Sequence, residues 1–302
     1  MTHKNRIGPA LALLACAGVC GTAFAGATLD RIRDTGHIRL AYLPGGKPFT
    51  SPGSGGTPEG YGVELCSRVA DSVKSSLGLS QLTVDWVEVR ADNVFDTVAS
   101  GNADLLCTPS NATLARRKTL SYSLPIFAGG IRAVVRDDTP MALRNVLEEQ
   151  PSQRNVWRGS PALNMIEQTR FATVAGTSSE KWLASKVKGF KLNTATVSVP
   201  DYASGIKFLM ERKIDVFLAE RDVVLATLDD KSRAKVVVLN RQITHEPLAL
   251  AMPRGDEDFR LQVDTALSAA YNAPEFSAMY VKYFHKLDDA TRSFFAWVTP
   301  AP

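Results

Sequence analysis

The stretch His37-Ile-Arg-Leu-Ala-Tyr42 is followed by Tyr61-Gly-Val-Glu-Leu-Cys-Ser-Arg-Val-Ala-Asp-Ser-Val-Lys-Ser-Ser-Leu77. The first segment is short and mostly apolar, which is typical of a strand. The second has apolar residues at helical spacing, and Gly78 is a natural helix end. Further strands are expected at 82–89 and 103–107, with a helix at 92–100 between them. The stretch therefore predicts a β-α-β-α-β unit.

The same alternation of strands and helices occurs again later in the chain. Strands are expected at 171–175, 194–199 and 214–218, separated by helices at 178–187 and 202–212. Each unit predicts a mostly parallel sheet with helices on both faces, so the fold class is α/β with two lobes.

The residues after Leu239 complete the division into lobes. They predict one strand (248–252) and two helices (256–272 and 274–284) that finish the first lobe, so the chain crosses between the lobes twice. Such a double crossover is a natural hinge. The predicted domains are residues 26–127 with 246–302 as lobe 1, and residues 128–245 as lobe 2.

The N-terminus has the pattern of a signal peptide. Lys4 and Arg6 precede an apolar stretch, and Ala23-Phe-Ala25 fits an A-x-A cleavage site. Residues 1–25 are therefore predicted to be removed after Ala25, which places the protein in the periplasm. In the alternative, Leu13-Leu-Ala-Cys16 is a lipoprotein box that leaves a lipidated Cys16. No later segment is long and apolar enough to span a membrane.

Charge and cysteine content narrow the class of protein. The 35 basic and 31 acidic residues are interleaved without a basic cluster, so no nucleic-acid partner is expected. Without the signal peptide, two cysteines remain, Cys66 and Cys107. An even pair in an exported chain favours one disulfide. The alternative is two buried free thiols.

Catalytic and metal-binding signatures are missing from the sequence. It has no P-loop, no G-x-S-x-G motif and no H-E-x-x-H motif, and its four histidines are scattered. No catalytic residue, metal or cofactor is therefore predicted, and a binding role is favoured over an enzymatic one.

Candidate ligand-binding residues follow the predicted strands, where ligands of α/β sheets bind. Thr177 and Glu180 fit a capping box at a helix start whose N–H groups attract anions, although a plain capped helix explains the same pattern. One arginine of the run Arg116-Arg-Lys118 could hold a carboxylate with two hydrogen bonds, or the run could simply be a solvated helix start. Glu220 could pair with an ammonium group, or favour a helix start electrostatically.

Several motifs occur together in one order: Thr28-Leu-Asp-Arg-Ile-Arg-Asp-Thr-Gly36, Gly60-Tyr-Gly-Val-Glu-Leu-Cys66, Gly101-Asn-Ala-Asp-Leu-Leu-Cys-Thr108, Thr113-Leu-Ala-Arg-Arg-Lys118, Ser121-Tyr-Ser123, Gly176-Thr-Ser-Ser-Glu180 and Glu246-Pro-Leu-Ala-Leu-Ala251. With them the chain resembles the family 3 extracellular solute-binding proteins, the polar amino-acid receptors of ABC importers, from Thr28 to about Phe284. The resemblance implies a type II periplasmic-binding-protein fold that closes on an amino acid.

The resemblance also implies roles for individual residues. Arg116 matches the arginine that holds the ligand α-carboxylate, and Arg117 then lies outside the pocket. Asn111 stands where a Ser or Thr is usual, and Glu220 where an Asp pairs with the ammonium group. Pro109 matches a residue whose backbone carbonyl binds the ammonium group. Thr177 and Ser178 match the helix-start residues of lobe 2.

The side-chain part of the predicted pocket departs from the branch that the chain resembles most. The glutamate/aspartate branch, which shares the positions of both cysteines, has arginines where this chain has Leu43 and Val94. An acidic side chain would lack charge partners there, which is costly in a closed cleft. Arg90 lies nearby in sequence and could compensate. The sequence therefore predicts a ligand with a neutral or apolar side chain.

The expected partners are a small amino acid and the membrane permease of an ABC importer, and the protein is expected to be a monomer. A periplasmic enzyme of the cyclohexadienyl dehydratase type is the alternative on the same fold, with Glu220 as general acid or base. A sensor input domain is a third reading, which the lack of a transmembrane or output segment disfavours.

Overall fold

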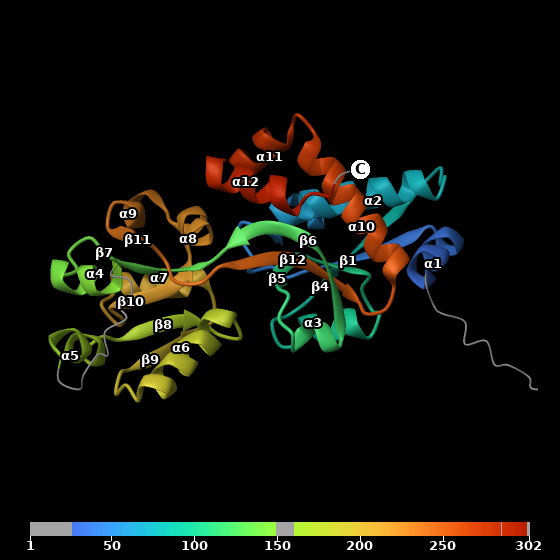
Figure 1. The fold of residues 1–302 in the computed structure, drawn as a ribbon. Helices are drawn as coiled ribbons and strands as arrows, with labels where there is room; N and C mark the ends of the chain where they lie inside the picture. Colours follow the sequence, from blue (N-terminus) through green and yellow to red (C-terminus); the bar gives the residue numbers. More distant parts are fainter. Residues whose placement is uncertain (1–25, 149–159, 285, 301–302) are drawn as a thin grey trace, which may run out of the picture.

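The computed structural model describes residues 26–148, 160–284 and 286–300. The predicted cleavage site after Ala25 and the alternative Cys16 lie outside these residues. The described chain forms two groups of strands and helices that lie side by side (Figure 1). None of its described helices has the length and apolar character needed to cross a membrane.

The first group is built on a five-stranded sheet with the order β4-β1-β5-β12-β6. Its strands are β1 (His37–Tyr42), β4 (Thr83–Glu88), β5 (Leu105–Asn111), β6 (Leu120–Gly129) and β12 (Glu246–Pro253). Its helices are α1 (Ala27–Thr35), α2 (Tyr61–Ser76), α3 (Val94–Ala99), α10 (Glu257–Asn272), α11 (Phe276–Phe284) and α12 (Asp289–Val298). A two-stranded sheet, β2 (Ser51–Pro52) with β3 (Pro58–Glu59), and two 3₁₀ turns, Ser54–Gly56 and Arg116–Lys118, complete it.

The second group is built on a five-stranded sheet with the order β11-β7-β10-β8-β9. Its strands are β7 (Ile131–Arg136), β8 (Phe171–Val174), β9 (Thr196–Val199), β10 (Val216–Glu220) and β11 (Val236–Gln242). Its helices are α4 (Met141–Glu148), α5 (Pro161–Glu167), α6 (Ser178–Phe190), α7 (Tyr202–Met210), α8 (Arg221–Thr227) and α9 (Asp230–Arg233).

The α/β class is confirmed, and both β-α-β-α-β units form. Each sheet is mostly parallel, as expected, because four of its five strands run in the same direction. In the first sheet β12 pairs antiparallel with β5 and β6, and in the second β7 pairs antiparallel with β10 and β11. The strands that return from the other group therefore join each sheet in the opposite direction.

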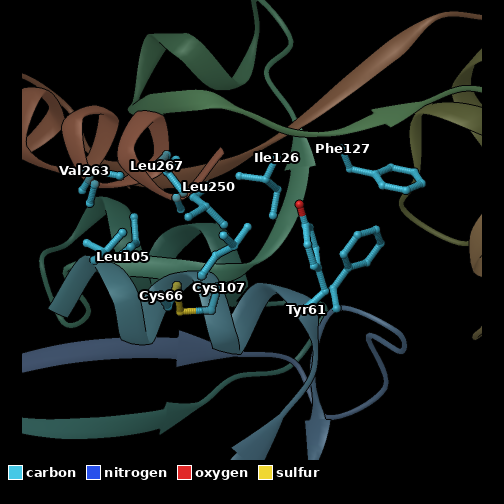
Figure 2. Packing of buried hydrophobic residues seen from close by; sticks show 14 of the residues in the cluster. Tyr61, Cys66, Leu105, Cys107, Ile126, Phe127, Leu250, Val263 and Leu267 are labelled. Atoms are coloured by element: carbon cyan, nitrogen blue, oxygen red, sulfur yellow. A yellow bond between two sulfur atoms is a disulfide. The ribbon is translucent and has the colours of Figure 1, made fainter. Parts of the chain in front are cut away.

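The core of the first group contains the predicted apolar face of α2. Val63, Cys66, Val69 and Val73 are buried, as the periodicity indicated. Cys66 forms a disulfide with Cys107, which ties α2 to β5 (Figure 2). The disulfide prediction is confirmed, and the alternative of two free thiols is wrong. The bond fixes the strand whose end reaches the candidate site.

The chain passes between the two sheets at two neighbouring places. The first crossing is Gly130, between β6 and β7, and the second is the segment 243–245, between β11 and β12. A Cβ atom at Gly129 would lie 2.4 Å from the carbonyl oxygen of Glu246, and one at Gly130 would lie 2.3 Å from the carbonyl oxygen of Thr244. The two crossings therefore pack so closely that the first requires glycine.

Candidate functional site

A pocket of about 240 Å³ lies between the two groups. Residues from both groups line it, among them every ligand-binding residue predicted from the sequence: Leu43, Val94, Pro109, Asn111, Arg116, Thr177, Ser178 and Glu220. The structure therefore brings the predicted residues to one place, although their contact with a ligand remains a prediction.

The ends of strands from both sheets explain this convergence. Pro109 and Asn111 lie at the end of β5, Glu220 is the last residue of β10, and Thr177 and Ser178 follow β8. The carboxyl ends of parallel strands lie at one edge of a sheet, and this edge is where ligands bind in α/β folds.

Arg116 lies on the wall formed by the first group. Its guanidinium carbon is 4.3 Å from the centre of the Phe95 ring, and its Nη1 donates to the carbonyl oxygen of Asn111 at 3.1 Å. Burial lowers the pKa of this half-buried arginine, and within the described part of the chain no carboxylate forms an ion pair with it. A guanidinium placed in this way has donors left for an anion. Arg117 is exposed and outside the pocket lining, as predicted.

Thr177 and Ser178 lie on the opposite wall, at the start of α6. Thr177 Oγ1 accepts a hydrogen bond from the backbone N–H of Glu180 at 3.4 Å, so the predicted cap is present. The reciprocal half of the capping box differs from the prediction, because the carboxylate of Glu180 accepts from the N–H of Gly176 at 2.9 Å. The N–H of Thr177, the donor expected in a capping box, bonds instead to the carbonyl oxygen of Val174 at 3.4 Å.

Glu220 lies where the pocket meets the hinge. Its side chain is buried, and its carboxylate accepts a hydrogen bond from the N–H of Gly130, the first crossing residue. Desolvation raises the pKa of Glu220 to about 7, against the lowering effect of that hydrogen bond, while the nearby carboxylates of Glu246 and Asp222 add to the rise. A cationic group in the pocket would favour the ionised form.

Asn111 connects the two groups directly. Its Nδ2 donates to Ser178 Oγ at 2.5 Å, and it also donates to the carboxylate of Glu246. Glu246 is the first residue of β12, directly after the second crossing. No sequence pattern indicated a function for Glu246, because its place beside Asn111 follows from the antiparallel pairing of β12 with β5.

The remaining wall of the pocket is mostly apolar. Leu43 and Val94 line it together with Phe49, Leu106 and Leu248, all of which are buried except the half-buried Leu43.

The cation proposed to compensate for missing arginines does not reach this wall. Arg90 lies outside the pocket lining, is 77% exposed and pairs with Asp92, so its nearness in sequence was misleading. Two charged residues of the lining, Lys47 and Asp201, were not predicted. Asp201 follows β9 and could have been found by the strand-end rule, whereas Lys47 lies in a glycine-rich loop that gives no such signal.

A comparison with protein families matches residues 38–286 to the bacterial extracellular solute-binding proteins, family 3. The chain belongs to this family. The predicted family is therefore confirmed, and with it the expectation of a binding protein. This solute-binding protein is 26% identical to the L-glutamate/L-aspartate-binding protein of Pseudomonas aeruginosa over 262 residues, which cover 85% of this chain and 80% of that one.

Other known proteins are similar over most of the chain. The glutamate/glutamine/aspartate/asparagine-binding protein BztA of Rhodobacter capsulatus is 24% identical, with coverage of 87% of this chain and 72% of that protein. The crystal structure of the ancestral amino acid-binding protein AncCDT-1, a precursor of cyclohexadienyl dehydratase, superposes with a TM-score of 0.67 at 21% identity, over 85% of this chain and 99% of that one. The predicted type II periplasmic-binding-protein fold is confirmed.

Proposed function

We propose that this solute-binding protein is the periplasmic receptor of an amino-acid ABC importer. One observation carries the proposal: a half-buried arginine, with no ion pair to any described carboxylate, and a buried glutamate line the same pocket, each from a different group of strands and helices. This arrangement suits a zwitterion, because the guanidinium of Arg116 can bind a carboxylate and the carboxylate of Glu220 can bind an ammonium group. The relatives named above as amino-acid-binding proteins support it.

The head group of the ligand would contact both lobes. Arg116 and the N-terminus of α6, with Thr177 and Ser178, would hold the α-carboxylate, since free N–H groups at a helix start attract anions. Glu220 and the backbone carbonyl of Pro109 would hold the ammonium group. Asn111 would lie between them, in the position where the family usually has a hydroxyl.

Closure would follow from contacts that form only when both lobes reach the ligand. We assign residues 26–127 and 246–302 to lobe 1 and residues 128–245 to lobe 2, with the two crossings as hinge. A ligand that contacts both lobes binds the closed state more tightly and shifts the population toward it. The importer permease would recognise that closed state, and the receptor would act as a monomer after removal of its signal peptide.

The apolar wall favours an amino acid with a neutral or apolar side chain. Leu43 and Val94 offer no charge partner to a second carboxylate, and Arg90 does not reach the pocket. Lys47 is exposed at the rim, where water screens its charge.

Isothermal titration calorimetry against a panel of single L-amino acids tests the proposal. We expect binding of one or several neutral amino acids. Selective tight binding of glutamate or aspartate would refute the side-chain assignment, and failure of every amino acid to bind would refute the receptor function.

The buried carboxyl group of Glu220 is also compatible with the alternative function, that of a dehydratase. A carboxyl group with a pKa of about 7 can act as a general acid or base. Turnover of a prephenate-like acid, followed by the absorbance of the aromatic product, would favour the enzyme. Binding of amino acids without such turnover favours the receptor.

A further inference from the structure

A chain of hydrogen bonds runs from the hinge to the start of α6. The carboxylate of Glu246, at the second crossing, accepts from Asn111 Nδ2. The same Nδ2 donates to Ser178 Oγ at 2.5 Å, across the boundary between the two lobes. Three elements that are far apart in sequence, β12, β5 and α6, are joined in this way.

Glu246 determines which groups donate and which accept in this series of hydrogen bonds. A carboxylate can only accept hydrogen bonds, so the amide of Asn111 must turn its nitrogen toward Glu246. Asn111 Oδ1 is consequently buried without a hydrogen-bond partner among the described residues. A buried acceptor without a partner costs free energy, so an amide free to rotate would favour another orientation. The carboxylate therefore holds the side chain in place.

The orientation of the Asn111 amide also determines the hydrogen-bonding role of Ser178. Because Ser178 Oγ accepts from Asn111, its own O–H remains available as a donor. Ser178 lines the pocket as the first residue of α6, where the first backbone N–H groups have no acceptor within the helix. The hydroxyl and the helix start together make this wall of the pocket donor-rich, which suits a carboxylate.

We propose that Glu246 is a positioning residue of the ligand site, which acts through Asn111 to present Ser178 as a hydrogen-bond donor to the ligand carboxylate. This rests on the proposed amino-acid receptor function. Asn111 then serves the contact between the lobes, whereas the Ser or Thr usual at its position contacts the ligand. The hinge and the carboxylate wall are coupled, because Glu246 belongs to the hinge and Ser178 to the wall.

The first test uses the unliganded protein. The side-chain amide signal of Asn111, identified by its loss in the Asn111→Ser spectrum, is followed by nitrogen-15 NMR. We expect Glu246→Ala to move this signal and to change the relative orientation of the lobes measured by residual dipolar couplings. The matched control Glu59→Gln removes a charge from an exposed position and should change neither. An Asn111 signal that is the same in Glu246→Ala and wild type would overturn the proposal.

The second test is a double-mutant cycle with Glu246→Ala and Ser178→Ala, using a mixture of the twenty common L-amino acids as the probe. We expect Glu246→Ala to weaken the apparent affinity about tenfold in the wild-type background and to have little effect once Ser178 is Ala. Equal weakening in both backgrounds would contradict the route through Ser178. If the wild-type protein does not bind the mixture, the proposed receptor function is wrong. The NMR signal of the Asn111 amide then still tests whether Glu246 orients the Asn111 side chain.

Discussion

The guanidinium of Arg116 lies over the ring of Phe95, with its central carbon 4.3 Å from the ring centre. The ring supports the guanidinium from one side, and the N–H donors that do not bond to the carbonyl oxygen of Asn111 remain for a ligand. Phe95 belongs to α3, the helix that also contributes Val94 to the pocket. One short helix therefore supports the proposed carboxylate-binding group and forms part of the apolar wall.

Replacement of Arg116 should abolish most of the binding. We expect Arg116→Ala to weaken the binding of amino acids by about 2–5 kcal/mol, because the ligand carboxylate would be buried without its partner. Arg116→Lys should restore only part of the loss, since a lysine cannot form two parallel hydrogen bonds. Calorimetric titration measures both, with the exposed neighbour Arg117→Ala as the matched control. A ligand-induced thermal shift that survives Arg116→Ala would contradict the assignment.

Ligand binding should depend on pH through Glu220. The pKa of this carboxyl group is raised to about 7, so below that value the free receptor carries it protonated. An ammonium ligand favours the ionised form, so binding at pH 6 should release a proton and be weaker than binding at pH 8. Titrations in buffers of different ionisation enthalpy measure the released proton. Glu220→Gln should remove this proton release, and its persistence in that variant would assign it to another group.

The stability of the unliganded protein should show the opposite trend with pH. Between roughly pH 4.5 and 7, the native state holds a proton on Glu220 that the unfolded state has lost, so the free energy of unfolding falls as the pH rises. The full effect of this one group is about 3 kcal/mol. Thermal unfolding of the wild type and Glu220→Gln across this range should diverge accordingly, and parallel curves would contradict the raised pKa.

Much of the fold follows from local periodicity, and the site follows from where strands end. The apolar face of α2 and the strands of both β-α-β-α-β units were predictable because each buries its own repeating pattern. β6 was not, because Pro125 interrupts its pattern; the structure accommodates this proline where the register with β12 shifts. Glu246 was not predicted for a related reason. Its position beside Asn111 depends on the antiparallel pairing of β12 with β5, which the sequence does not reveal.

Loss of the disulfide should destabilise the first lobe. The bond between Cys66 and Cys107 closes a loop with a sequence separation of 41 residues, and its removal should lower the free energy of unfolding by about 2–4 kcal/mol. Denaturant unfolding of the double variant Cys66→Ser/Cys107→Ser measures this change. Treatment with a reductant should lower the stability of the wild type and leave the double variant unchanged.

The first hinge crossing should not tolerate a side chain. In Gly130→Ala the added Cβ would lie 2.3 Å from the carbonyl oxygen of Thr244, so the two crossings would have to move apart. We expect a destabilisation of about 1–3 kcal/mol, seen as a lower melting temperature. Gly189→Ala is the control, since nothing lies within 4 Å of its Cβ and alanine favours the helix. Equal melting temperatures for the two variants would show that the crossing is loose.

Specificity for the ligand side chain should change when charge is added to the apolar wall. Leu43 and Val94 line the pocket in the positions where the glutamate/aspartate branch is expected to carry arginines. The double variant Leu43→Arg/Val94→Arg should gain affinity for glutamate and lose it for neutral amino acids, because the arginines pair with a second carboxylate and otherwise leave charges buried without partners. Competition between glutamate and neutral amino acids, measured by calorimetry, reports the change. Since Val94 is only 8% exposed, each single variant should be tested for folding by circular dichroism. A folded double variant whose preference is unchanged would show that the ligand side chain points toward another wall.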